Sequence, residues 1–142
     1  MILRRTILLA VLAAALPALA QDKGAKAPQL GIKGYDPVSY FTEGRPAKGA
    51  PAIHHDFDDA RYLFSSQKNR SLFSADPGRY EPQFGGLCAT GIAFGQKAQS
   101  DPEQWAIVNG KLYVFSSIEA KAKVVKDPSL LTRAHKSFSS VK

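Results

Sequence analysis

Cysteine is nearly absent from this chain: Cys88 is the only one among 142 residues. A single cysteine cannot close an intramolecular disulfide, so disulfide bonds do not hold the fold together. One thiol is also too few for a zinc site built from several thiolates. After residue 20 there is no apolar run long enough to cross a membrane, so we expect no stable membrane anchor. The remaining residues are enough for one small domain with a modest core.

The first 20 residues have the pattern of a secretory signal peptide. Arg4 and Arg5 form a basic start, residues 7–16 are apolar, and residues 18–20 (Ala-Leu-Ala) suit a cleavage site. The pattern predicts a periplasmic or secreted protein, and the arginine pair leaves general and twin-arginine export both open. The formal net charge of +7 comes from scattered lysines and arginines, which indicates a solvated surface rather than a nucleic-acid partner.

Turn residues and alternating side chains predict an α+β fold, a small single domain of short antiparallel hairpins packed with short helices. Residues 21–33 are interpreted as a flexible linker, and residues 34–142 as the domain with a C-terminal helical extension. One hairpin is expected over residues 54–64. A second is expected over residues 104–115, where an Asn-Gly pair suits a type I′ turn.

A pattern of strand, serine pair, helix and Asp-Pro occurs twice, 51 residues apart. Phe64-Ser65-Ser66 matches Phe115-Ser116-Ser117, and Asp76-Pro77 matches Asp127-Pro128. In each copy a serine can cap the start of a helix, and the proline prevents the helix from continuing. Two interpretations remain open. The chain contains a duplicated unit, or two unrelated junctions use the same capping residues.

Four segments carry a resemblance to a known family: residues 34–41 (GYDPVSYF), 62–66, 73–80 and 84–89 (FGGLCA). With them the chain resembles the YHS domain family, in its exported subgroup. The resemblance implies a small scaffold that, in relatives attached to copper-transporting ATPases and some hydroxylases, looks like a cysteine-based metal-binding module. The thiol positions of those relatives fall on Ser39, Ser65 and Asn69 here. Neutral hydroxyls and an amide do not replace thiolates for zinc or Cu(I), so that metal site is not expected in this chain.

Cys88 is the strongest candidate for a functional residue, because it follows Gly85 and Gly86 in a segment of small side chains. A helix that starts near Gly86 would place the thiol in the first turn, where unpaired amides favour a thiolate. The glycines would let a cofactor approach the backbone, so all three are candidate cofactor-binding residues. The other interpretation is a small buried side chain. His54 and His55 are adjacent in a predicted strand and point to opposite faces, so at most one joins Cys88 as a metal ligand.

These residues support three hypotheses. The first is a binding module for a small ligand, a metal ion or metal-containing cofactor, with copper or another transition metal held by Cys88 and one of His54 or His55. The second is a thiol-dependent redox protein or enzyme with Cys88 as the nucleophile. The third is a structural interaction domain with Cys88 buried. An accessible thiol beside a histidine and a pocket favours the first two hypotheses, and full burial among apolar side chains favours the third.

Overall fold

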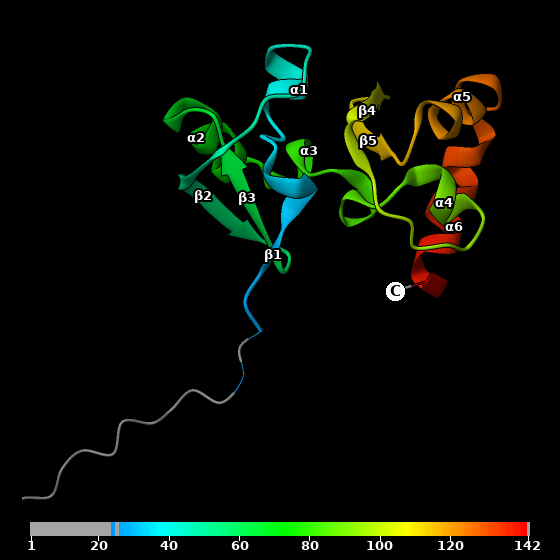
Figure 1. Cartoon of the computed structure of the whole chain (residues 1–142), viewed down its shortest axis with the longest axis horizontal. Helices are drawn as coiled ribbons and strands as arrows, with labels where there is room; N and C mark the ends of the chain where they lie inside the picture. The colour runs from blue at the N-terminus through cyan, green and yellow to red at the C-terminus, as the bar shows by residue number, and fades with distance from the viewer. Residues whose placement is uncertain (1–23, 25, 142) are drawn as a thin grey trace, which may run out of the picture.

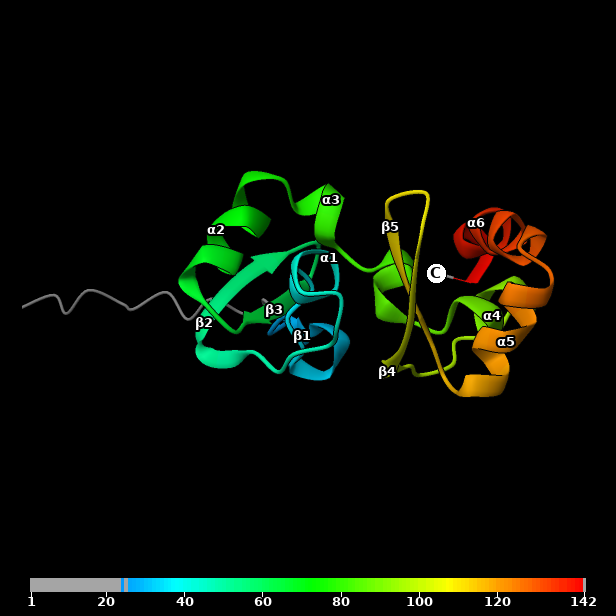
Figure 2. The same ribbon diagram turned by 90° about the horizontal axis from the view of Figure 1, so that it is seen from above.

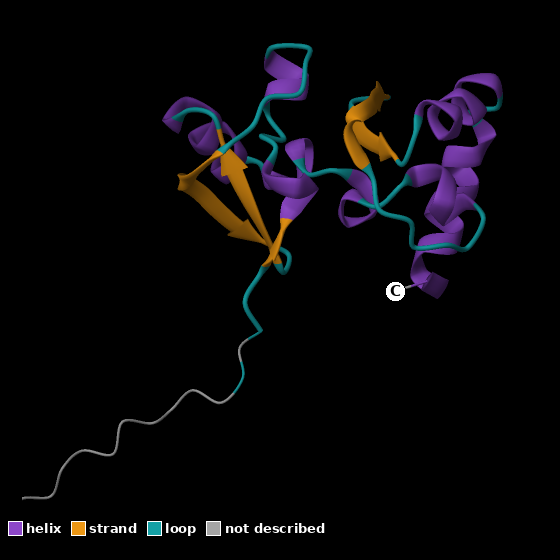
Figure 3. Cartoon of the chain, viewed as in Figure 1, coloured by secondary structure: helices purple, strands orange, loops and turns teal. Residues whose placement is uncertain are grey.

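The computed structural model describes residue 24 and residues 26–141 (Figures 1 and 3). The predicted signal peptide lies outside the described residues. The fold is α+β, as predicted, with short helices packed on two small sheets built from antiparallel hairpins. In chain order the elements are β1 (Gln29–Leu30), η1 (Gly31–Gly34), α1 (Ser39–Thr42), β2 (Ala50–Phe57), β3 (Ala60–Phe64), α2 (Gln67–Ala75), α3 (Pro77–Tyr80), η2 (Gln83–Gly86), α4 (Ala89–Ala93), β4 (Asp101–Val108), β5 (Lys111–Phe115), α5 (Ile118–Lys126) and α6 (Ser129–Val141). In the part of the chain that the structure describes, no helix has the length and apolar character that a membrane span requires.

The first sheet has the strand order β1-β3-β2. β2 and β3 form the predicted hairpin, closed by Asp58 and Asp59, which both have positive φ. β1 runs parallel to β3, starting at Gln29, and Ile32 in the following 3-10 turn is only 4% exposed. The linker predicted for residues 21–33 is therefore wrong at its C-terminal end, because from Gln29 onward the chain pairs with a strand and contributes to the core.

The second sheet is the β4–β5 hairpin, and both turn residues, Asn109 and Gly110, have positive φ as a type I′ turn requires. β5 is buried on both faces. Its Leu112 and Val114 join the core formed by β3, α1 and α2, whereas Tyr113 and Phe115 join the core beneath α4, α5 and α6. The hairpin thus stands between the two halves of the molecule (Figure 2) and unites them in one domain.

The helix predicted to start near Gly86 begins later than expected. Phe84, Gly85 and Gly86 all have positive φ, and the segment Gln83–Gly86 forms a short 3-10 turn. A right-handed α-helix requires negative φ at every residue, so it cannot form over this segment. α4 starts only after Cys88, which is its N-terminal cap.

The two halves of the fold repeat the same unit. β2, β3 and α2 are followed 51 residues later by β4, β5 and α5, each as long as its counterpart. Both hairpins shift register at the same place, after Ala50 in the first and after Asp101 in the second. Ser66 and Ser117 each accept a hydrogen bond from the backbone amide three residues further on. Of the two interpretations of the sequence pattern, the structure favours a duplicated unit.

We call residues 29–80 unit A and residues 81–131 unit B. The repeat includes the segments before the hairpins, since η1 and η2 are both 3-10 turns that end in three residues with positive φ. The backbone amide of Asp36 donates to the Ala47 carbonyl at 2.8 Å, and that of Cys88 donates to the Ala98 carbonyl at 2.9 Å. Asp36 and Cys88 therefore occupy equivalent places in the two units.

Candidate functional site

The two histidines of the sequence prediction lie in unit A, on strand β2. The Nδ1 atom of His54 is 3.0 Å from the Pro51 carbonyl, and the His55 ring packs edge-on against Phe73 at 5.8 Å. β2 and the start of α4 lie on opposite sides of the molecule in both ribbon views (Figures 1 and 2). The structure therefore does not bring Cys88 together with either His54 or His55. Across the described residues, no three His, Cys, Asp or Glu side chains group in a way that could hold a metal ion.

Gly85 and Gly86, predicted to contact a cofactor, do not line the cavity that Cys88 lines. A Cβ added to Gly86 would lie 3.2 Å from Cγ2 of Ile32, so this glycine lets the η1 and η2 turns pack together. Gly85 lines a cavity of about 200 Å³ between Asp58, Glu81 and His135, to which Cys88 does not contribute. Burial and the nearby Asp58 carboxylate raise the pKa of Glu81 above its ordinary value.

Cys88 is buried, with 1% of its surface exposed. Its thiol donates toward Oγ of Ser116 at 3.4 Å, and its sulfur accepts a hydrogen bond from the Gly91 amide, also at 3.4 Å. The backbone of Cys88 bridges to Val114 on β5. The thiol is thus held by one hydroxyl and one amide, and no histidine or other base takes part. This burial matches the alternative interpretation of the sequence, a small enclosed side chain.

A cavity of about 450 Å³ opens in front of Cys88. It is lined by α4 and the loop that follows it, by the serine pair after β5, and by the first two turns of α5. Gly91 and Ser116 contact the thiol, and Ala120 and Lys123 line the cavity from α5. We call this space the unit B cavity. Its volume falls in the range of small-molecule sites in proteins.

At the equivalent place in unit A the space is filled by a network centred on Asp36, which is fully buried. Its Oδ1 accepts from the amides of Val38 and Ser39 at 2.8 and 3.3 Å. Its Oδ2 accepts from the amide and hydroxyl of Ser65 at 2.9 and 2.7 Å, and from Nδ2 of Asn69 at 2.7 Å. Five donors satisfy the carboxylate, as burial of a charged group requires.

The three positions that the YHS resemblance matches to thiols, Ser39, Ser65 and Asn69, therefore all contact Asp36. The side chains of Ser65 and Asn69 donate to its carboxylate, whereas the Ser39 hydroxyl donates to its backbone carbonyl at 2.8 Å. That chemistry does not suit a thiophilic metal, since all three side chains are neutral and already have partners.

In unit B the side chains at two of the corresponding positions are smaller. Ala120 stands where unit A has Asn69, and Ser116 stands where it has Ser65. Gly91 lies three residues after Cys88, as Ser39 lies three residues after Asp36. Each unit uses the same backbone geometry, but two of the side chains that fill the space in unit A are reduced to hydrogen or methyl in unit B. Both of these small residues belong to the lining of the unit B cavity. Sequence reasoning missed it, although the 51-residue repeat contained the signal.

Comparisons with models of protein families, with curated proteins and with solved structures found no match to this chain. Its function is therefore inferred from the side chains of the two units.

Proposed function

We propose that this chain is an exported binding module whose small-molecule site is the unit B cavity. The observation that carries the proposal is the difference between two equivalent places in one molecule. In unit A a buried carboxylate and its donors occupy this place, and in unit B Cys88, Gly91 and Ala120 belong to the lining of a cavity of about 450 Å³. Packing without voids is the rule in small domains, so an open space of this size at a site that can be filled suggests that it is kept for a ligand.

The donor set favours an organic ligand over a metal ion. Cys88 and Glu119 are the two lining side chains that could offer a metal ion a thiolate or a carboxylate. The remaining polar groups are hydroxyls, an amide and a lysine. Transition-metal sites in proteins are built from three or four thiolate, imidazole or carboxylate ligands. The residues present do not fit a metal centre. Bound metal thus remains a prediction from the sequence, and elemental analysis of wild type and Cys88→Ala decides it.

A thiol enzyme is less well supported, because a nucleophilic cysteine needs a neighbouring base or a group that stabilises the thiolate. The Cys88 thiol instead donates to a neutral serine and is enclosed. The third hypothesis, a structural interaction domain, is supported by this burial of Cys88. It differs from our proposal in one respect: it assigns no ligand to the unit B cavity.

The experiment fills the cavity and asks whether binding is lost. Ala120→Asn introduces the side chain that unit A carries at the equivalent place, and Ala122→Asn makes the same change on the exposed side of the same helix. Wild type and both variants, labelled with ¹⁵N, are titrated with a set of small organic compounds. Saturable shifts of the amides of residues 88–98 and 116–123 are expected in wild type and Ala122→Asn, and are expected to disappear in Ala120→Asn.

Two results would contradict the proposal. In one, no compound shifts these amides in the wild type. In the other, Ala120→Asn responds to the same compounds as Ala122→Asn does. Either outcome would leave a structural interaction domain as the better description of the chain.

A further inference from the structure

We propose that the unit B cavity takes a small organic anion, with Lys123 and the hydroxyls of Ser116 and Ser117 recognising its carboxylate. This inference rests on the proposed function, since it names the class of ligand for the same cavity. Three features of the cavity and its edge support the inference: hydroxyl donors without a partner among the described residues, the distribution of charge and an exposed aromatic ring.

Two hydroxyl groups of the lining have a donor to spare. Ser116 is exposed, and its Oγ accepts from the Cys88 thiol, which leaves its own O–H available. The Oγ of Ser117 accepts from the Ala120 amide, so its O–H is available too. Thr90, by contrast, already donates to the Ala120 carbonyl at 2.7 Å. A ligand that supplies hydrogen-bond acceptors satisfies the two serines, and a carboxylate supplies several.

Positive charge gathers at one side of the cavity around the ring of Phe94. The Nζ atom of Lys123 is 5.9 Å from the ring centroid, and Cζ of Arg133 is 4.9 Å from it. Neither cation forms a salt bridge within the described part of the chain. Glu119 is the one acidic group in the lining, four residues before Lys123, and it has no salt bridge there either. Lys123 and Glu119 balance each other within the lining, and Arg133, beside Phe94 but outside the lining, adds a second cation at this edge of the cavity.

Phe94 gives the ligand an apolar surface. Its side chain is 50% exposed at the edge of the cavity, although phenylalanine is usually buried. Ala98 and Ala120 add methyl groups to the lining. An anion with a short hydrocarbon part would cover this apolar surface while its carboxylate meets the lysine and the hydroxyls. A bare inorganic anion would use only the polar part of the site.

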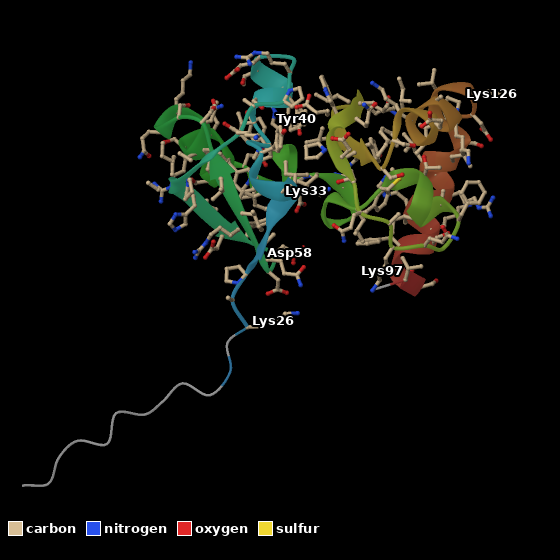
Figure 4. All side chains as sticks on the ribbon, in the orientation of Figure 1. Lys26, Lys33, Tyr40, Asp58, Lys97 and Lys126 are labelled. Atoms are coloured by element: carbon tan, nitrogen blue, oxygen red, sulfur yellow. The ribbon has the colours of Figure 1, made fainter. Side chains whose placement is uncertain are left out.

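The test compares three probes with the same four-carbon chain: butyrate, n-butylamine and n-butanol. Each is titrated at pH 7 into ¹⁵N-labelled wild type, Lys123→Gln, Lys126→Gln and Ala120→Asn. Lys126 is exposed at the far end of α5 (Figure 4) and does not line the cavity, so it is the matched control. We expect butyrate to shift the amides of residues 116–123 saturably. We also expect about tenfold weaker binding of butyrate to Lys123→Gln and unchanged binding to Lys126→Gln.

The outcomes separate this inference from the proposed function. If butylamine or butanol binds the same amides as tightly as butyrate, or if Lys123→Gln binds butyrate like wild type, the anion inference is wrong. Loss of the shifts in Ala120→Asn would then still support a ligand cavity in unit B. If none of the three probes shifts these amides, the anion inference falls, and the wider set of compounds decides whether the cavity binds anything.

Discussion

Replacing Asn69 by alanine tests whether the filled site of unit A stabilises the fold, because this substitution gives unit A the residue that unit B already has. Asn69 is 6% exposed, and its Nδ2 donates to the Asp36 carboxylate at 2.7 Å. Removing a hydrogen bond to a buried charged group costs about 1.5–3 kcal/mol, and alanine recovers roughly 0.5 kcal/mol through its higher helix propensity. The expected loss of unfolding free energy is therefore about 1–2.5 kcal/mol.

For a domain of this size, 1 kcal/mol corresponds to roughly 4 °C in melting temperature, so Asn69→Ala should melt about 4–10 °C below wild type. Urea unfolding followed by far-ultraviolet circular dichroism measures the free energy. The control is Lys68→Ala, an exposed neighbour in α2, which should stay within about 0.5 kcal/mol of wild type. A change in Asn69→Ala no larger than the control's would refute the reasoning, because the Asp36 network would then contribute nothing measurable to stability.

Three further predictions use other parts of the structure. In the native protein Cys88 should react with iodoacetamide more slowly than a model thiol and should become reactive on unfolding, since 1% of it is exposed; rapid native labelling would show that the site opens. Gly49→Ala should lower the melting temperature more than Gly78→Ala, because a Cβ at Gly49 would clash with the Leu63 backbone, whereas one at Gly78 would meet only Oδ1 of Asp76 at 4.0 Å; equal losses would contradict this packing. Burial and Lys111 lower the pKa of His135, so the unfolded state takes up the proton more readily and stability should fall as the pH drops below about 6.5. Between pH 7.5 and pH 5 the melting temperature should decrease less in His135→Gln than in wild type. An equal decrease in both proteins would exclude this contribution of His135.

The hairpins were predictable because their signals are local. Residues 54–64 and 104–115 alternate around short turns, and the Asn-Gly pair requires a conformation that few other pairs adopt. β1 had no such signal: Gln29–Leu30 is a strand only because β3 lies beside it. The late start of α4 also has a tertiary cause. The positive φ values of η2 let Gly86 approach Ile32, which belongs to the other unit.

Of the residues that the sequence singled out, Cys88 belongs to the candidate site of the structure. Cys88 does line a cavity, as a functional residue would, but it is also buried, as the alternative interpretation required. The pairing with His54 or His55 failed because sequence spacing does not fix the distance between a strand of one unit and a helix cap of the other. Gly91 and Ala120 line the cavity, and their small size becomes apparent only when the two units are compared position by position.

The difference between the units follows from one substitution at equivalent places. A buried carboxylate at Asp36 must be surrounded by donors, so unit A requires Ser65 and Asn69 and cannot open. A thiol at Cys88 carries no such requirement, because Ser116 and one backbone amide satisfy it. Ala120, the unit B counterpart of Asn69, therefore need not donate a hydrogen bond. The loop on that side of unit B is also shorter: Asp36 and Cys88 are 52 residues apart, whereas Ala47 and Ala98 are 51 apart. Unit A thus retains the packed network that stabilises the domain, and unit B can keep an open cavity because the neighbouring unit does not depend on filling it.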